Sequence, residues 1–200
     1  MRNKKKTVLI FSSSKIEAMQ EDDEPDESVG VMRTGNTIYF YTDVTVKSVL
    51  ALQMALDSAA AETVVCGCDH INLFIMSNGG DLHAGFAAHD AIWGTRVWVN
   101  TIVSGCAFSA GHLLAMGGHS RYMTRHSQLL VHQISHSFQG KSAAMHDEIM
   151  NDRAATQRIV DVYVARTSMS PAEVRSMLSN ERHVFVEEAK QLGLIDGVWE

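Results

Sequence analysis

The residue best placed for covalent chemistry is Ser109, which stands among small residues in the stretch 105–111, Gly-Cys-Ala-Phe-Ser-Ala-Gly. An apolar run, 97–103, precedes this stretch and a second, 112–116, follows it, so the sequence predicts a strand that turns sharply and restarts as a helix. Small neighbours permit such a turn, leave the serine hydroxyl clear at a helix N-terminus, and let a substrate carbonyl approach the backbone amides. The stretch therefore indicates either a serine nucleophile or, more simply, a tight turn with a helix-capping serine.

Two further features are placed to complete a hydrolytic site around this serine. A Gly-Gly pair ending at Gly80 follows the apolar run 71–76, at the carboxyl end of an expected strand, where parallel sheets bind ligands. The backbone N–H groups of Gly80 and Ala110 could hold an oxyanion, although an ordinary turn explains the glycine pair equally well. His132 ends the apolar stretch 128–131 and could act as a general base, the alternative being a buried histidine bonded to the backbone.

The elements expected to position these residues alternate between strand and helix. Apolar runs and helical spacing predict strands at 37–41, 71–76 and 97–103, separated by helices at 45–61 and 84–93. This order indicates an α/β domain with right-handed parallel crossovers, in which helices cover both faces of the sheet.

Composition indicates one globular domain preceded by a polar arm. Of the 200 residues, 46% are hydrophobic and 20% charged, which is enough apolar material for a sizeable core. Residues 20–28 are acidic and carry no apolar side chain. We therefore expect residues 1–36 to form a mobile arm and residues 37–200 to form the catalytic domain.

Charge and cysteine content exclude several classes of function. A formal net charge of −6 and a pI near 5.9 argue against nucleic acid as a partner. No stretch reaches the roughly 18 apolar residues that a membrane span requires. The three cysteines, at positions 66, 68 and 106, suit reduced cytosolic thiols. Because no second cysteine pair is present, we expect no metal site.

Taken together, the Gly-Gly turn, the small-residue serine motif and the strand ending in His-Gln resemble the ClpP family of serine peptidases, within the ClpP/crotonase superfamily. The resemblance runs from about Thr37 to Asp196. Its specific parts are residues 75–80, 105–111 and 129–133, together with a closing motif, Glu-Ala at 188–189 and Gly-Leu-Ile-Asp at 193–196.

The resemblance implies a role for each candidate residue. Ser109 corresponds to the nucleophile and His132 to the base, and the backbones of Gly80 and Ala110 correspond to the oxyanion donors. The family usually has an aspartate shortly before the closing motif, but this chain has none there. Ungapped alignment back from that motif places Glu181 at the position, where a glutamate can orient an imidazole as an aspartate does; a solvent-facing charge is the alternative.

The polar segment 140–166 has apolar residues every three to five positions, which predicts an amphipathic helix more than about 30 Å long. In the resembled family this is the handle helix, by which two heptameric rings meet; the alternative is a long helix packed on its own domain. Residues 170–173, Ser-Pro-Ala-Glu, form a capping box that starts another helix, ending at about Leu178.

The resemblance implies a serine endopeptidase that hydrolyses unfolded polypeptides inside a homo-oligomeric ring in the cytoplasm and that needs neither a metal nor an organic cofactor. Any ATP dependence would belong to an AAA+ unfoldase partner, because the sequence has no G-x-x-x-x-G-K-[ST] motif. Three alternatives remain: a crotonase-type enzyme acting on acyl-CoA, a ClpP-like ring subunit with little or no activity, and a virus-encoded protease that trims capsid or scaffold proteins in the host cytoplasm.

Overall fold

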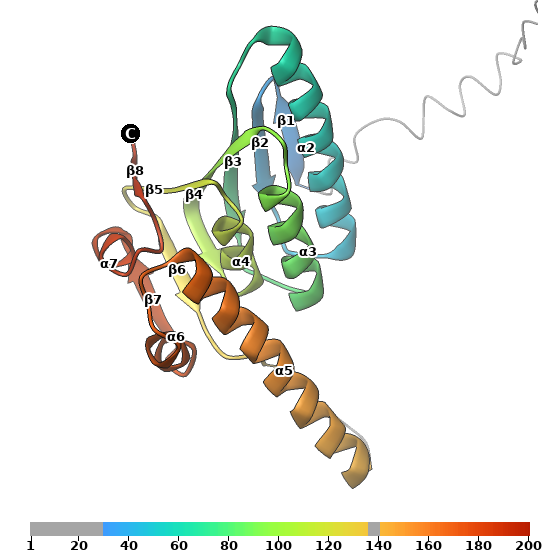
Figure 1. Ribbon diagram of the computed structural model, residues 1–200, viewed down its shortest axis with the longest axis vertical. Helices are drawn as coiled ribbons and strands as arrows, with labels where there is room; N and C mark the ends of the chain where they lie inside the picture. Colours follow the sequence, from blue (N-terminus) through green and yellow to red (C-terminus); the bar gives the residue numbers. More distant parts are fainter. Residues whose placement is uncertain (1–29, 136–140) are drawn as a thin grey trace, which may run out of the picture.

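A mixed sheet organises the protein, whose structure, a computed structural model, describes residues 30–135 and 141–200 (Figure 1). The strands run in the order β1-β2-β3-β4-β5-β8, and β6 pairs with both β4 and β7. Pairing is antiparallel for β1 with β2 and for β6 with β7, and parallel elsewhere. The bounds are β1 Val31–Thr34, β2 Thr37–Tyr41, β3 His70–Ser77, β4 Trp98–Phe108, β5 Ser120–Thr124, β6 Gln128–Val131, β7 Arg182–Phe185 and β8 Gly197–Trp199.

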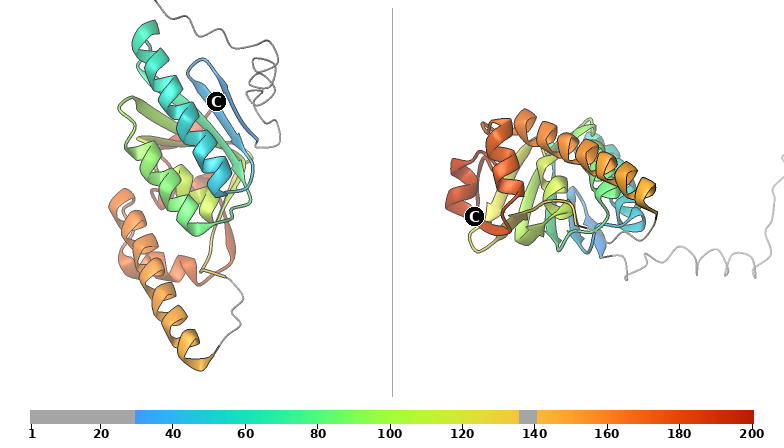
Figure 2. Two further views of the ribbon diagram at one scale, coloured as in Figure 1. Left: turned by 90° about the vertical axis from the view of Figure 1, so that its right-hand side faces the viewer. Right: turned by 90° about the horizontal axis from the view of Figure 1, so that it is seen from below.

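Helices connect the parallel strands. Their bounds are α2 Val46–Cys66, α3 Leu82–Trp93, α4 Ala110–Met116, α5 Ser142–Arg166, α6 Pro171–Leu178 and α7 Val186–Gln191. This α/β arrangement of repeated β-α-β units, with a long helix that projects from the body, confirms the expected fold class (Figures 1 and 2).

Two expectations about the sheet are wrong. We expected helices on both faces, but α2, α3 and α4 pack on one face, over Leu73 and Ile75, while Phe74 and Met76 on the other face stay partly exposed. Aromatic rings shield this second face in part, because Phe74 packs against Tyr39 and Trp199. We also expected order to begin at residue 37, but β1 precedes it as an edge strand, whose mostly exposed side chains give little hydrophobic signal. Residues 1–29 of the expected arm lie outside the described residues.

Capping residues fix where two of the helices begin. The Thr45 hydroxyl accepts the backbone N–H of Ser48, which starts α2, and Gly67 ends that helix in the left-handed conformation, with φ of 70°. At α6, Ser170 and Glu173 form the expected capping box, with Pro171 in the first turn. The predicted helix from Pro171 to Leu178 is thus confirmed.

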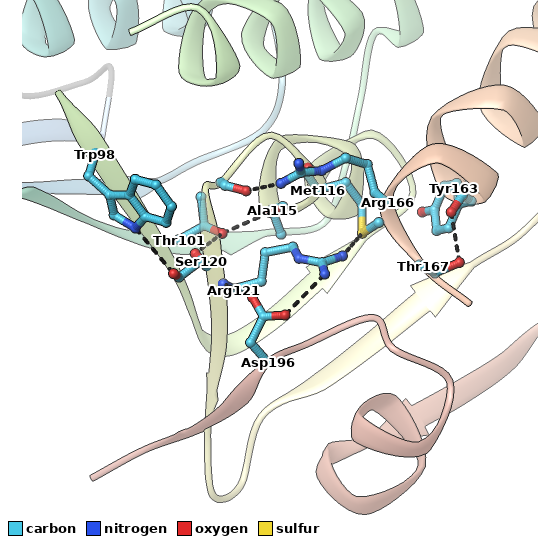
Figure 3. A network of polar contacts seen from close by, with 11 residues as sticks. Trp98, Thr101, Ala115, Met116, Ser120, Arg121, Tyr163, Arg166, Thr167 and Asp196 are labelled. Atoms are coloured by element: carbon cyan, nitrogen blue, oxygen red, sulfur yellow. Dashed lines mark hydrogen bonds and ion pairs between the residues drawn. The ribbon is translucent and has the colours of Figure 1, made fainter. Parts of the chain in front are cut away.

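The handle, α5, has 25 residues and is about 37 Å long by helical rise. Its first half extends away from the sheet (Figures 1 and 2). The last turns attach it to the body, since the Arg166 guanidinium donates to the carbonyls of Met116 and Gly118 and lies 4.0 Å over the Trp93 ring (Figure 3). The packing is therefore confined to the carboxyl-terminal part of the helix.

The closing motif anchors the C-terminal strand. The Asp196 carboxylate accepts the backbone N–H of Arg121 at 2.8 Å and the guanidinium of the same residue at 3.2 Å (Figure 3). Arg121 and Asp196 directly precede the first paired residues of β5 and β8, Tyr122 and Gly197, so these contacts hold the two strands together where their pairing begins. Since Arg121 is largely buried, the carboxylate also compensates a desolvated charge.

The structure bears on the expectations of reduced cysteines and of no membrane-spanning segment. Cys68 is disulfide-bonded, which differs from the reduced thiols expected, whereas Cys106 is free. Of the helices in the described ranges, none combines the length and apolar character needed to cross a bilayer.

A buried polar pair joins α4 to α5. His112 is 1% exposed, and its Nδ1 lies 2.8 Å from the Tyr163 hydroxyl. Burial, with the nearby positive charge of Arg121, lowers the pKa of His112 to about 3. Burial raises the pKa of the Tyr163 phenol. Both groups are therefore neutral in the folded protein near pH 7.

The lowered pKa of His112 predicts a specific loss of stability in acid. Between about pH 6.5 and pH 3 the unfolded chain binds a proton at this residue and the folded chain does not, so the free energy of unfolding falls as pH is lowered. Urea unfolding at one protein concentration should show His112→Gln with a weaker pH dependence than wild type in this window.

The matched control is His146→Gln on the handle, where solvent reaches the ring in the folded state. This control should keep the wild-type pH dependence. Equal pH slopes for wild type and His112→Gln would contradict the assignment of a buried neutral imidazole.

Candidate active site

Ser109 occupies a strained turn between β4 and α4. Its φ of 51° and ψ of −123° make it the non-glycine residue with positive φ among those described. Such a conformation costs about 1–3 kcal/mol and persists only where the surroundings enforce it. The serine takes the N-cap position but its hydroxyl makes no capping hydrogen bond. The half-buried serine thus adopts a strained turn and lacks the capping interaction that the simpler interpretation requires.

Glycines enforce the turn because a side chain would collide with it. A Cβ on Gly79 would lie 2.8 Å from both the Ser109 Cβ and the Phe108 carbonyl oxygen. A Cβ on Gly111 would lie 2.8 Å from that of Ser77. The buried Ser77 hydroxyl accepts the Gly79 N–H at 3.1 Å, which holds the glycine loop against the serine.

Strand pairing brings His132 to the serine. β6 lies parallel to β4, with Leu130 opposite Phe108. The Ser109 N–H donates to the Leu130 carbonyl at 2.8 Å, which extends this pairing by one step. Because the two strands end at the same edge, His132, just beyond Val131, emerges beside the turn. Its side chain is half-buried.

The backbone amides of Gly80 and Ala110 have the freedom that an oxyanion hole requires. Val44 bonds to the groups on either side of Gly80: its N–H donates to the Gly79 carbonyl at 2.7 Å, and its carbonyl accepts from Asp81 at 2.8 Å. The N–H of Gly80 itself takes no part in this bridge. Ala110 is the first residue of α4, so its N–H lies outside the helical hydrogen-bond ladder.

One cavity of about 100 Å³ unites four of the predicted site residues, Gly80, Ser109, Ala110 and His132. Its remaining lining is mostly apolar and comes from α3, α4, β6, α5 and α6, together with the segment after β6, which contributes Ile134 and the polar Gln133 and Ser135. The helix and strand residues include Leu82, Leu113, Val131, Ile159, Tyr163 and Leu178. Sequence reasoning missed this lining; the spacing of four between residues 159 and 163 placed both on one helix face, but nothing in the sequence said what that face contacts.

Glu181 is the site residue that the cavity does not include. It directly precedes β7, and because the antiparallel β6–β7 ladder ends with Val131 opposite Arg182, the next step of the same register places its backbone opposite His132. Its side chain is exposed and lines a separate hollow with Glu173 and Asn180. The neighbouring Arg182 pairs with Glu188.

The chemistry available in this cavity is that of a nucleophile, a base and two N–H donors. The described residues include no cluster of three or more His, Cys, Asp or Glu side chains that would hold a metal ion. A serine hydroxyl beside an imidazole, with backbone donors on the same cavity, is the arrangement used for acyl transfer.

Comparison with known proteins agrees with this geometry. The structure is similar to that of a point mutant of ClpP1 from Listeria monocytogenes, with a TM-score of 0.74, 20% sequence identity, and coverage of 83% of this chain and 92% of that one. At this identity the likeness shows the fold. The family model for Clp protease matches residues 28–200. The chain therefore belongs to the Clp protease family.

Proposed function

We propose that this Clp-family peptidase is a serine endopeptidase in which Ser109 is the nucleophile and His132 the general base. The observation that carries the proposal is the strained serine turn, which shares one cavity with the imidazole and with both candidate oxyanion donors. A serine in a structural turn would need neither the strain nor the apolar cavity beside it.

The reaction begins when the His132 imidazole takes the hydroxyl proton as Ser109 Oγ bonds to the peptide carbonyl carbon. The negative charge that develops on the carbonyl oxygen is held by the N–H groups of Gly80 and Ala110. As the peptide bond breaks, the imidazolium gives its proton to the leaving amine. Water, deprotonated by the same imidazole, then hydrolyses the acyl-serine ester.

Glu181 is proposed as the group that orients the imidazole. Its support is positional: the antiparallel β6–β7 ladder ends with Val131 opposite Arg182, so the next step of the same register places the Glu181 backbone opposite that of His132. Rotation of its side chain from the neighbouring hollow toward His132 would complete a Ser-His-Glu triad.

Polypeptides that have lost their fold are the proposed substrates, and the catalytic sites are proposed to face the interior of a homo-oligomeric ring. Three handle residues support assembly, because Met145, Ile149 and Met150 are about half exposed on the part of α5 that extends from the body. Membership of the Clp protease family supports an ATP-driven unfoldase in the cytoplasm as the proposed partner. Any ATP dependence would belong to that partner, since the sequence has no G-x-x-x-x-G-K-[ST] motif.

A second candidate function is that of a ring subunit without catalytic activity. The exposed side chain of Glu181, outside the cavity, favours it. Hydrolysis of casein by the purified protein would distinguish the two functions. Labelling of Ser109 by a fluorophosphonate would also exclude a crotonase-type reaction, which has no use for a serine nucleophile at this turn.

Loss of either central residue should abolish hydrolysis. Ser109→Ala and His132→Ala should each lower kcat/KM for a short fluorogenic peptide by at least about 10³-fold, because members of such a unit act together. Assembly, measured by native mass spectrometry, should stay unchanged. His126→Ala is the matched control, because this exposed histidine lies in the β5–β6 connection, away from the cavity lining. Retained activity in Ser109→Ala would refute the assignment.

The role of Glu181 is tested by removing its charge alone. If it orients His132, Glu181→Gln should lower kcat by about 10²–10⁴-fold, while Glu181→Asp should be milder. A short peptide substrate ensures that no unfoldase limits the rate. The exposed Glu187 on α7 provides the control, Glu187→Gln, which should match wild type. A kcat for Glu181→Gln within about twofold of wild type would leave a Ser-His dyad.

The ring is tested by the mass of the assembly. Native mass spectrometry should show several copies of the chain, and Ile149→Asp on the exposed part of the handle should reduce the number of copies by placing a charge where apolar side chains meet. A monomer in sedimentation velocity at micromolar wild-type protein would contradict this prediction.

A further inference from the structure

The cavity beside Ser109 has a lining that is largely apolar away from the reacting residues. Ser109, His132, Gly80 and Ala110 lie at the reacting part of its lining, while Leu113, Ile159, Tyr163 and Leu178 make up an apolar part contributed by three helices. A peptide whose carbonyl carbon meets the serine Oγ, with its carbonyl oxygen toward the two amides, directs the side chain of its acyl residue into such a space.

Tyr163 is the largest side chain of this apolar part, and its position is fixed. It is 2% exposed, and its hydroxyl lies 2.8 Å from Nδ1 of His112. His112 belongs to α4, all of whose residues are buried, so it cannot move without repacking the core. The backbone carbonyl of Tyr163 also accepts a hydrogen bond from the Thr167 hydroxyl at 2.7 Å (Figure 3).

The volume of the cavity limits what enters it. The cavity has a volume of about 100 Å³. An engineered apolar cavity of about 150 Å³ in another protein is the size that holds benzene. By this comparison, the cavity is better matched to a valine or leucine side chain than to a phenyl or indole ring.

The lining also selects against charge. Besides Ser109, His132 and the paired Tyr163, the described lining offers two polar side chains, Gln133 and Ser135, and no acidic, lysine or arginine side chain. A lysine or glutamate side chain placed there would therefore lose hydration without gaining an ion-pair partner.

We propose that Tyr163, held by His112, sets the size of the side chain accepted on the acyl side of the cleaved bond, so that the site prefers aliphatic residues to aromatic ones. This inference rests on the proposed endopeptidase function. It adds a specificity-determining residue, Tyr163, and a positioning residue, His112, neither of which takes part in the bond-making steps.

The test uses fluorogenic peptides that differ only in the residue before the cleaved bond. For wild type, kcat/KM with leucine should exceed that with phenylalanine by about tenfold or more, the range over which hydrophobic pockets discriminate. Tyr163→Leu should raise the phenylalanine-to-leucine ratio of kcat/KM by about tenfold. Tyr163→Phe keeps the ring but loses the hydroxyl that bonds to His112, so it should raise this ratio by less than Tyr163→Leu does.

His112 is tested through the same ratio. His112→Ala frees the phenol and should raise the relative rate for phenylalanine, whereas His112→Gln, which keeps a hydrogen-bonding partner, should raise it less. Circular dichroism reports whether each variant folds, and Tyr163→Met replaces Tyr163→Leu if that variant does not.

The outcomes separate this inference from the function on which it rests. Equal wild-type rates for leucine and phenylalanine peptides, or an unchanged ratio in folded Tyr163→Leu or Tyr163→Met, would overturn the role of Tyr163 while leaving the endopeptidase intact. Absence of both peptide hydrolysis and fluorophosphonate labelling of Ser109 would overturn the proposed function, and this inference with it.

Discussion

The close approach of two backbone segments, the Gly-Gly loop after β3 and the serine turn after β4, is the constraint on which the site depends. Gly79 leaves no room for a side chain against Ser109, and Gly111 leaves none against Ser77. The strained φ of the serine therefore cannot relax without separating the two segments. Because the same segments carry both proposed oxyanion donors, one packing contact fixes the nucleophile and the groups that would stabilise its reaction.

The helix that follows the serine extends this constraint into the core. All residues of α4 are buried, including His112, and this imidazole bonds to Tyr163 on α5. The handle is consequently part of the site at one end and exposed at the other, where Ile149 lies about half open to solvent. An assembly formed through the exposed end would make contacts with the same helix that lines the cavity. The proposed ring and the proposed pocket therefore share α5.

Local sequence signals predicted the elements that carry the chemistry, and long-range contacts decided the rest. The serine turn, the Gly-Gly loop and the strand leading to His132 were predictable because each depends on a few adjacent residues. The His112–Tyr163 pair was not, since 51 positions separate its members and each alone fits an ordinary core or helix face. β1 was missed because an edge strand buries too little to impose an alternating pattern. The open sheet face was missed because the rule that helices cover both faces of a parallel sheet assumes that a chain covers its own sheet.

For Glu181, the position of the backbone agrees with the proposed role but the direction of the side chain does not. Alignment back from the closing motif places Glu181 at the third position of the triad. The β6–β7 ladder agrees, because in an antiparallel pair the step beyond Val131 and Arg182 places Glu181 opposite His132. The ladder fixes Cα positions but not the rotamer of an exposed side chain, and a glutamate has one more rotatable bond than an aspartate through which to point elsewhere. A shorter carboxylate would be held nearer the imidazole by the backbone alone. The longer one needs a second contact to hold it, and Arg182, which stands next to it, is already paired with Glu188. The orientation of the imidazole therefore depends on a rotamer that the backbone of this chain does not by itself determine.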